Sequence, residues 1–313
     1  MFPEFIDASL LAAFKSCPEL ARKGYVEHWK SKLPSVHLHA GGAFAAGMEA
    51  ARSSFYVAGA DAPTSVETGK KRLAAFYGDF DCPPDSAKSR ERMLGAFDFY
   101  FANYPLDHTI APILLPGGKR GIELSFAEPL PIKNPDTGDP LIYVGRADAI
   151  LNFAGGRYIT DEKTTTQLGA SWSRQWDLRS QFMGYVWLSR QAGIPVTGAL
   201  IRGVSILKTK YETQQAIVNH PQWSVDRWYG EMLSWVEDLV RCYTTNRWRH
   251  NFDHACAEYG GCQFRTVCAS QDETPWLETH FERRAWNPLL RTETRLITAA
   301  ECNSEWTFEK AKP

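Results

Sequence analysis

The chain has 313 residues, of which 44% are hydrophobic and 23% are charged. This length allows one large domain or two smaller ones, and the composition is that of an ordinary globular protein, which excludes a disordered chain. Thirty-five basic against thirty-six acidic residues give a net charge of −1, so no global positive field attracts nucleic acid and any anion-binding surface must be local.

Residues 1–104 have the apolar periodicity of helices. Ser9 is placed to cap the run DASLLAAFKSC, and Pro18 suits the first turn of the next helix. The runs GGAFAAGMEAARSSFYV and SRERMLGAFDFYFANY repeat the amphipathic period. The sequence therefore predicts an N-terminal helical part.

Residues 105–250 change from helical periodicity to short β-rich runs, and we expect them to form the core of the fold. The short β-rich runs GIELSFAEPL, LIYVGRADAILNF and GRYITDEKT are separated by the turn sequences NPDTGDP and AGG. A helix is expected over SRQWDLRSQFMGYVWLSRQAG, then a strand over VTGALIRGVSIL and a long helix over WSVDRWYGEMLSWVEDLVRCYTTN. This order predicts an α/β fold with a central mixed sheet flanked by helices. Residues 251–313 follow as a Cys-bearing segment and tail, within one integrated domain.

The chain shows no membrane or export segment. It has no run of eighteen apolar residues, and its start, MFPEFIDASLLAAF, lacks the basic region and small-residue cleavage site of a signal peptide. We therefore expect a cytoplasmic protein with no membrane partner. In a reducing compartment, seven cysteines are expected to be buried thiols or metal ligands.

The two strands around the AGG turn carry a group of charged residues. Period-two alternation places Asp161 and Lys163 on one face and Glu162 on the other. Asp148, on the preceding strand, comes close to Asp161 if the turn sets the register. Two close carboxylates repel each other, which raises a pKa unless a cation lies between them. Oxygen ligands with no nearby Cys or His favour Mg²⁺ or Mn²⁺.

A metal, an activated water and a lysine are the groups that phosphodiester hydrolysis requires. Lys163 could orient or deprotonate such a water. The alternative is an exposed cross-strand pair of Asp161 and Lys163, with Asp148 as an ordinary strand-end residue, and the short pattern alone favours neither interpretation.

These residues resemble motifs of the PD-(D/E)XK nuclease superfamily, in the RecB-like branch that includes iron–sulfur nucleases of the CRISPR-associated and AddB type and phage exonucleases. Asp148 matches the aspartate of the G-x-x-D motif, and Asp161 and Lys163 match the D-x-K motif. Gln181 and Tyr185 have the Q-x-x-x-Y spacing of the branch, and residues four apart on a helix share a face. The opening run SLLAAFKSCPELARKGYV is similar to the first helix of the branch.

The chain departs from the branch at one position. The run GGAFAAGMEAA resembles the G-x-x-x-H helix, but Ala45 stands where many members have a metal-binding histidine. Glu123, on the strand before the hairpin, matches an acidic position of several members and could compensate as a metal ligand. A strand glutamate that faces solvent explains Glu123 at least as well.

The resemblance implies a restriction-endonuclease-like fold and a metal-dependent deoxyribonuclease, most plausibly an exonuclease of phage or bacterial recombination or repair. It implies that the metal is held by Asp148, Asp161 and the backbone carbonyl of Glu162. Lys163 would position the attacking water, while Gln181 and Tyr185 would hold the lysine or a phosphate.

The partners that the resemblance implies are DNA with single-stranded or free ends and a recombination or annealing protein. Two alternatives stay open. One is an endonuclease or a nuclease of the CRISPR-adaptation type, and the other is a non-catalytic DNA-binding protein on the same fold.

Four cysteines form a candidate metal centre. Cys256, Cys262 and Cys268 lie in a C-x5-C-x5-C arrangement with glycines that let the backbone approach an inorganic centre. The iron–sulfur members of the branch add one cysteine of the Cys-Pro region, here Cys17, although they usually have two residues between the first pair. Four thiolates suit a 4Fe-4S cluster or a structural Zn²⁺ equally, and the resemblance favours the cluster. Buried free thiols are the alternative, and His254 could complete a zinc site.

Local basic residues are candidate DNA contacts. Arg247 and Arg249 flank Trp248, and basic groups beside an aromatic ring suit a phosphate backbone and a stacked base. Solvated surface charge is the alternative for each cluster. The other candidate DNA contacts are Lys119, Arg120, Arg202, Lys208 and Lys210.

Overall fold

The structure, a computed structural model, describes residues 1–33, 35–115, 118–257, 261–288 and 296–297. The chain forms two compact units whose segments alternate along the sequence. Unit 1 consists of Met1–Pro34, Ala127–Gly145 and Asp226–Glu293, and unit 2 of Ser35–Phe126, Arg146–Val225 and Thr294–Pro313. The predicted parts 1–104, 105–250 and 251–313 were distinguished by their sequence patterns instead, and this division stays a prediction.

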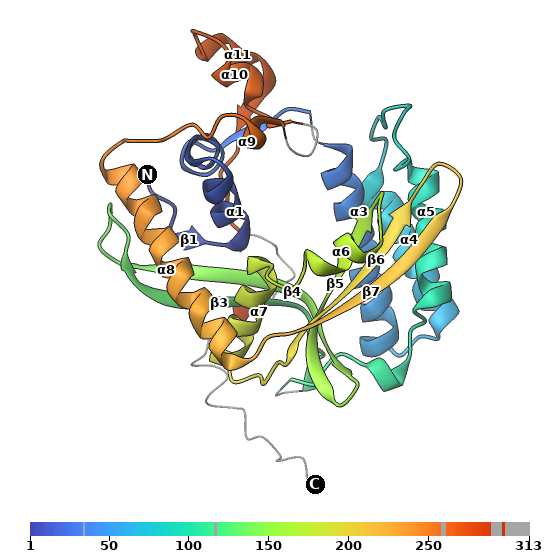
Figure 1. The fold of residues 1–313 in the computed structure, drawn as a ribbon. Helices are drawn as coiled ribbons and strands as arrows, with labels where there is room; N and C mark the ends of the chain where they lie inside the picture. Colours follow the sequence, from blue (N-terminus) through green and yellow to red (C-terminus); the bar gives the residue numbers. More distant parts are fainter. Residues whose placement is uncertain (34, 116–117, 258–260, 289–295, 298–313) are drawn as a thin grey trace. The chain divides into compact units, whose positions relative to one another are not determined.

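Among the described residues, seven strands form the central sheet, in the order β7-β6-β5-β4-β3-β9 with β1 beside β4 (Figure 1). β4 is antiparallel to β5, β5 is parallel to β6, and β6 is antiparallel to β7. The sheet is therefore mixed, which confirms the predicted α/β fold. The strands are β1 (Phe5–Ile6), β3 (Ile122–Lys133), β4 (Pro140–Phe153), β5 (Gly156–Thr165), β6 (Gly198–Ile206), β7 (Tyr211–Asn219) and β9 (Leu296–Ile297).

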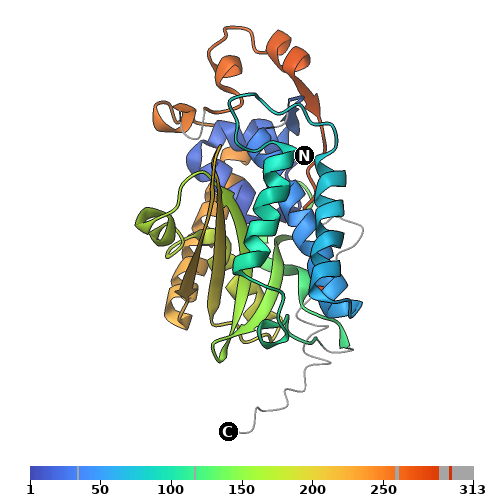
Figure 2. The ribbon, with the colours of Figure 1, turned by 90° about the vertical axis from the view of Figure 1, so that its right-hand side faces the viewer.

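Helices cover both faces of the sheet in unit 2 (Figure 2). Because β6 is covered on both sides, all nine of its residues are buried, and its alternate side chains enter two different cores. Val204 and Ile206 pack against α3 and α5, whereas Ala199 and Ile201 pack against Trp172 and Phe182. The helices of this unit are α3 (Val36–Arg52), the π-helix Ser53–Val57, α4 (Ala62–Tyr77), α5 (Arg90–Asn103), the 3-10 helix His108–Ile110, α6 (Ala170–Arg174) and α7 (Ser180–Gln191).

Unit 1 combines the first helices with the C-terminal segment. β2 (Trp29–Ser31) pairs with β8 (Phe281–Arg283) in an antiparallel two-stranded sheet. A small core of Phe264, Val267, Leu277 and Phe281 lies beside it. None of the described helices is long and apolar enough to cross a membrane. The helices are α1 (Ala8–Ser16), α2 (Pro18–Ala21), the π-helix Arg22–Val26, α8 (Gln222–Thr244, which begins in unit 2), α9 (His254–Ala257), α10 (Arg265–Cys268) and α11 (Thr274–His280).

Two local predictions were wrong in detail. The first helix is capped by Asp7, whose side chain accepts from the Leu10 amide, rather than by Ser9, which lies inside the helix. The helix expected over residues 173–193 is broken into α6 and α7 by tight turns at 173–179. Trp172 and Trp176, at the break, are both buried against β6, so tertiary packing overrides the local periodicity there.

A close helix crossing in unit 2 provides a test of the fold. A Cβ atom on Gly69 of α4 would lie 2.7 Å from the carbonyl oxygen of Gly47 on α3 and 2.7 Å from the Phe97 ring. We expect Gly69→Ala to lower the free energy of unfolding by about 1–3 kcal/mol, measured by urea denaturation. The matched control is Gly230→Ala in α8, where a Cβ meets nothing within 4 Å. This control should be stabilised by about 0.5–1 kcal/mol, and equal stability of the two variants would contradict the tight crossing.

Candidate functional site

The candidate site lies in unit 2, at the point where the pairing of β4 with β5 ends. Ala154 and Gly155 both have positive φ, which makes a two-residue hairpin turn and fixes the register. The pairing runs from Phe153 opposite Gly156 to Ala149 opposite Thr160. Asp148 directly precedes and Asp161 directly follows the last of these pairs, and the charge of Asp161 raises the pKa of Asp148, so the two carboxylates lie near each other. β5 continues beside β6 to Thr165. The carboxylates of β4 and β5 therefore lie where β4 stops pairing with β5.

Asp161 is the centre of a short chain of polar contacts. Its carboxylate is 4% exposed, and Lys163 Nζ lies 2.7 Å from Oδ1 and 2.9 Å from Oδ2. Gln181 Nε2, on α7, donates to Asp161 Oδ2 at 3.4 Å and to the Tyr185 hydroxyl at 3.1 Å. The structure therefore brings together the predicted aspartate, lysine and Gln-Tyr pair, although they come from β5 and from a helix about twenty residues later.

Lys163 is protonated in this arrangement. Burial lowers its pKa, but the charge of Asp161 and the hydrogen bond to it outweigh burial, so the pKa of Lys163 is raised from its ordinary value. Lys163 is therefore a hydrogen-bond donor here and has no free electron pair with which to accept a proton from water.

The acidic residues of the site hold protons more tightly than ordinary carboxylates. Burial, followed by the charges of Asp161 and Glu123, raises the pKa of Asp148 well above its usual range. Burial also raises the pKa of Glu123 to about 7, against the opposing charge of Arg146. Burial raises the pKa of Asp161 as well, despite Lys163. A bound cation could replace these protons, because it removes the repulsion that favours them.

Glu123 does not face solvent. It is 8% exposed, has a φ of 52°, and its carboxylate oxygen Oε2 accepts from the Arg146 guanidinium. The solvent-facing interpretation of this residue was therefore wrong. Arg146 already neutralises one of its oxygens, so Glu123 lies in the acidic group as part of an ion pair.

The donor set of the site fits a hydrated hard cation. Among the residues that the structure describes, no three Asp, Glu, His or Cys side chains are arranged to hold a metal by themselves. Mg²⁺ is usually bound through one or two carboxylates while it keeps several waters. Asp161 Oδ1 is buried and makes no hydrogen bond, although it lies within ion-pair distance of Lys163. Asp148 and Asp161 therefore supply the two carboxylates that such an ion needs.

A second buried cluster lies on the opposite face of β5, and the sequence analysis missed it. Glu162 Oε1 accepts from Arg52 Nη2 at 2.5 Å, from the Tyr100 hydroxyl at 3.0 Å and from Thr160 Oγ1 at 3.2 Å. Arg52 is 4% exposed, and its positive charge also acts on Asp148. Arg52 therefore balances carboxylates on both β4 and β5. A lone arginine in the small, apolar run AAGMEAAR was the available sequence signal.

Besides Arg52, α3 contributes an acidic residue that acts on the acidic group, Glu49. Its charge raises the pKa of Glu123, whereas Ala45, one turn earlier, is exposed. Ala45 has no polar group, so the acidic residue that α3 contributes here is Glu49.

The candidate DNA contacts differ in their exposure. Arg120 donates to the Pro112 carbonyl at 3.2 Å, and Lys210 is paired with Glu212 at 2.6 Å. Lys119 and Lys208 are exposed. Arg202 is 8% exposed, and its Nε donates to Gln215 at 3.0 Å while its guanidinium lies over the Tyr104 ring. Because Arg202 is used inside the protein, its selection as a DNA contact was wrong.

Arg179 is an exposed cation that the sequence analysis did not select. It is the N-cap residue of α7, two positions before Gln181, and its side chain makes no capping hydrogen bond. The positive charge of Arg179 lowers the pKa of Lys163. Arg179 therefore lies close enough to Lys163 for both side chains to bind one anionic ligand.

The four predicted cysteines, Cys17, Cys256, Cys262 and Cys268, line one pocket in unit 1, although the described part of the chain does not arrange them as a ready-made metal site. All four are free and partly buried. Burial raises the pKa of Cys262, with further contributions from Cys17 and Cys256, and burial raises the pKa of Cys268 to about 11. Cys262 and Cys268 therefore hold their protons more tightly than ordinary thiols, and a metal would release these protons on binding. The side chain of His254 lies outside the described structure.

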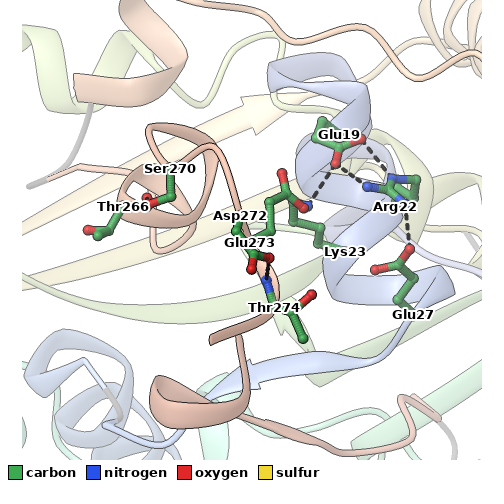
Figure 3. Close-up of polar contacts among 9 residues, drawn as sticks. All are labelled: Glu19, Arg22, Lys23, Glu27, Thr266, Ser270, Asp272, Glu273 and Thr274. Carbon is green, nitrogen blue, oxygen red and sulfur yellow. Dashed lines mark hydrogen bonds and ion pairs between the residues drawn. The ribbon is translucent and has the colours of Figure 1, made fainter. Parts of the chain in front are cut away.

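A buried ion network joins the same two chain segments (Figure 3). Lys23 is fully buried, and its Nζ lies 2.9 Å from Glu19 and 2.5 Å from Glu273. Arg22 pairs with Glu19 and with Glu27. Glu19 lies on α2, directly after the Cys17–Pro18 pair, and Glu273 follows α10, which ends at the pocket cysteine Cys268. The network therefore holds the cysteine-bearing segments together through charge pairs of the protein itself.

No protein-family model matches the chain, and no curated protein matches it. Similar solved structures include the crystal structure of a "putative exonuclease" from Eubacterium rectale, with a TM-score of 0.50 and 12% identity, covering 81% of this chain and 87% of that chain. They also include the crystal structure of SSO0001, with a TM-score of 0.31 and 13% identity, covering 77% of each chain. At 12% identity, the Eubacterium rectale protein shows a shared fold, and it is similar to this chain over most of both lengths.

The raised pKa of Glu123 predicts how stability changes with pH. Between its ordinary value of 4.5 and about 7, the folded protein keeps a proton that the unfolded chain releases. The free energy of unfolding therefore falls as pH rises through this window, by at most about 3 kcal/mol from this group. Metal-free protein should melt at a lower temperature at pH 7.5 than at pH 5.5. Glu123→Gln should flatten this change, whereas the exposed control Glu212→Gln should not; equal pH profiles for all three would refute the assignment.

Proposed function

We propose that the chain is a divalent-metal-dependent deoxyribonuclease, an exonuclease of phage or bacterial recombination or repair. The observation that carries this proposal is the contact of Asp161 with both Lys163 and Gln181, beside Asp148, whose pKa is raised. The shared fold with the Eubacterium rectale protein supports a nuclease. The substrate would be DNA with single-stranded or free ends, and a recombination or annealing protein is the proposed partner.

Asp148 and Asp161 would hold Mg²⁺ or Mn²⁺, with the backbone carbonyl of Glu162 as a further ligand. When bound, such an ion stabilises the charge on the phosphate and lowers the pKa of its water. The protein's own groups have separate tasks. Lys163, as a protonated donor, would orient the water or bind a phosphate oxygen, and Gln181 holds both Asp161 and Tyr185 in place.

Two arginines support this arrangement from different sides. Arg52 holds Glu162 through a buried ion pair, so the segment that carries Asp161 and Lys163 is tied to α3. Arg179 is exposed at the start of α7, where a phosphate next to the cleaved bond could pair with it. Arg52 is therefore proposed to position the site, and Arg179 to bind the substrate.

The first test is the rate of Mg²⁺- or Mn²⁺-dependent cleavage of end-labelled linear DNA. Lys163→Ala should lower this rate by at least about a hundredfold, because the water or phosphate loses its positioned donor. Lys70→Ala, which removes a partly exposed lysine paired with Asp98, is the matched control and should cut at the wild-type rate. A Lys163→Ala variant that cuts normally would reject the assignment.

The same assay separates the alternatives. Cleavage of closed circular DNA would indicate an endonuclease rather than an exonuclease. The observation that favours a non-catalytic DNA-binding protein is the lack of a ready-made three-residue metal site among the described residues. DNA binding by a wild-type protein that neither binds Mn²⁺ nor cuts any of these substrates would support that second function.

For the cysteine pocket we propose a 4Fe-4S cluster, with a structural Zn²⁺ as the alternative. Anaerobically purified protein should absorb broadly in the visible range and contain iron, whereas a zinc protein should be colourless and contain zinc. Cys262→Ser should lose the metal and lower the melting temperature. Cys82→Ser, which lies outside the pocket, should keep both. Wild-type protein free of iron and zinc would indicate buried free thiols.

A further inference from the structure

The segment after α8 in unit 1 has a defined shape without being a helix or strand. This segment, residues 246–253 with the sequence NRWRHNFD, is called the 246–253 loop below. Asn246 and Asp253, at its two ends, have φ values of 49° and 74°, which Asn and Asp adopt more readily than most other residues. These two left-handed residues turn the chain out of α8 and into α9.

The backbone of the 246–253 loop is fixed to the first helices of the same unit. The Arg249 carbonyl accepts from the Glu19 amide at 3.3 Å. The Asn251 amide donates to Cys17 Sγ at 3.4 Å, and Asn251 Nδ2 donates to the Ser16 carbonyl at 2.6 Å. The loop is therefore held against one of the four pocket cysteines, and its side chains are displayed from a fixed backbone.

Two stacked rings lie on this loop, where both also line the cysteine pocket. Phe252 is 63% exposed, and its ring is nearly parallel to that of His250, with centroids 5.3 Å apart and an interplanar angle of 8°. An exposed phenylalanine gains little from burial, so core packing does not account for it. The pair presents a flat aromatic surface to solvent.

The charges around this surface are positive. Arg247 and Arg249 are exposed, and among the described residues neither has a carboxylate partner, in contrast to Arg241 of α8, which pairs with Asp238. The single acidic residue of the loop is Asp253. Two arginines that lack protein anions beside a flat ring pair are complementary to a ligand that carries both phosphates and bases.

We propose that the 246–253 loop binds single-stranded nucleic acid, with a base stacked on the Phe252–His250 pair and phosphates on Arg247 and Arg249. The choice of nucleic acid as ligand rests on the proposed nuclease function. A single strand or frayed end is favoured because a duplex keeps its base faces inside its own stack, whereas stacking on an exposed ring needs a free face. Because Cys17 holds Asn251, the cysteine pocket positions this loop.

The first test measures the affinity for a fluorescein-labelled oligothymidylate by anisotropy, with no divalent metal added so that the probe is not cut. Phe252→Ala should weaken binding about tenfold, within the range for loss of one stacked base. The matched control is Trp276→Ala, which removes the aromatic partner of another stacked ring pair, Trp276–His280, in the same unit. It should bind as tightly as wild type. Melting temperatures of both variants should match wild type, since both rings are exposed.

The second measurement is the salt dependence of the same binding. Arg247→Ala should reduce the slope of log affinity against log salt concentration by about 0.7, the value for one lost phosphate contact on a single strand. Arg241→Ala should leave the slope unchanged. The proposal is overturned if Phe252→Ala binds as wild type, if Trp276→Ala weakens binding equally, or if Phe252→Ala weakens binding to an end-closed duplex as much as to the single strand.

These measurements are independent of cleavage. A chain that binds through Phe252 but never hydrolyses DNA would refute the nuclease assignment and keep the binding loop. A chain that cuts DNA in a Lys163-dependent way with unchanged affinity in Phe252→Ala would keep the nuclease and refute the loop. The two failures are therefore distinguishable.

Discussion

The candidate active site depends on one constraint, the point at which β4 and β5 cease to pair. The two-residue turn at Ala154 and Gly155 sets the register, and the last pair is Ala149 with Thr160. Asp148 and Asp161 are the next residues along the two strands, and Asp161 is buried while Asp148 is half-buried. Burial and repulsion by neighbouring carboxylates raise the pKa of Asp148. The nearby cationic side chains partly neutralise this group of carboxylates.

Those cations act from both faces of the sheet. Lys163 compensates Asp161 on the α7 side, while Arg52 compensates Glu162 on the α3 side and also acts on Asp148. Removing one partner of a buried pair costs far more than removing a surface pair. This explains why a strand with three consecutive charged residues, Asp161 to Lys163, can lie inside a folded sheet: alternate side chains find their counterions in different layers.

Unit 1 uses charge in a different way. Lys23 is fully buried between Glu19 and Glu273, and the thiols of the cysteine pocket lie beside this network. The same first helices also fix the backbone of the 246–253 loop through Ser16, Cys17 and Glu19. One short N-terminal segment therefore organises the ion network, the cysteine pocket and the proposed binding loop.

The sequence by itself determined the features that depend on local periodicity. Alternation along β5 put Asp161 and Lys163 on one face of the strand, and helical spacing put Gln181 and Tyr185 on one face of a helix. The AGG run predicted a turn between the strands of Asp148 and Asp161, but the structure set the register through a two-residue turn. The mixed sheet and most helices followed from the same patterns. Only the tertiary structure decided that Arg202 is buried, that Glu123 is an internal ion pair, and that Arg52 and Lys23 reach carboxylates 110 and 250 residues away. Periodicity shows which residues share a face, but which segment covers that face depends on packing between parts of the chain that are remote in sequence.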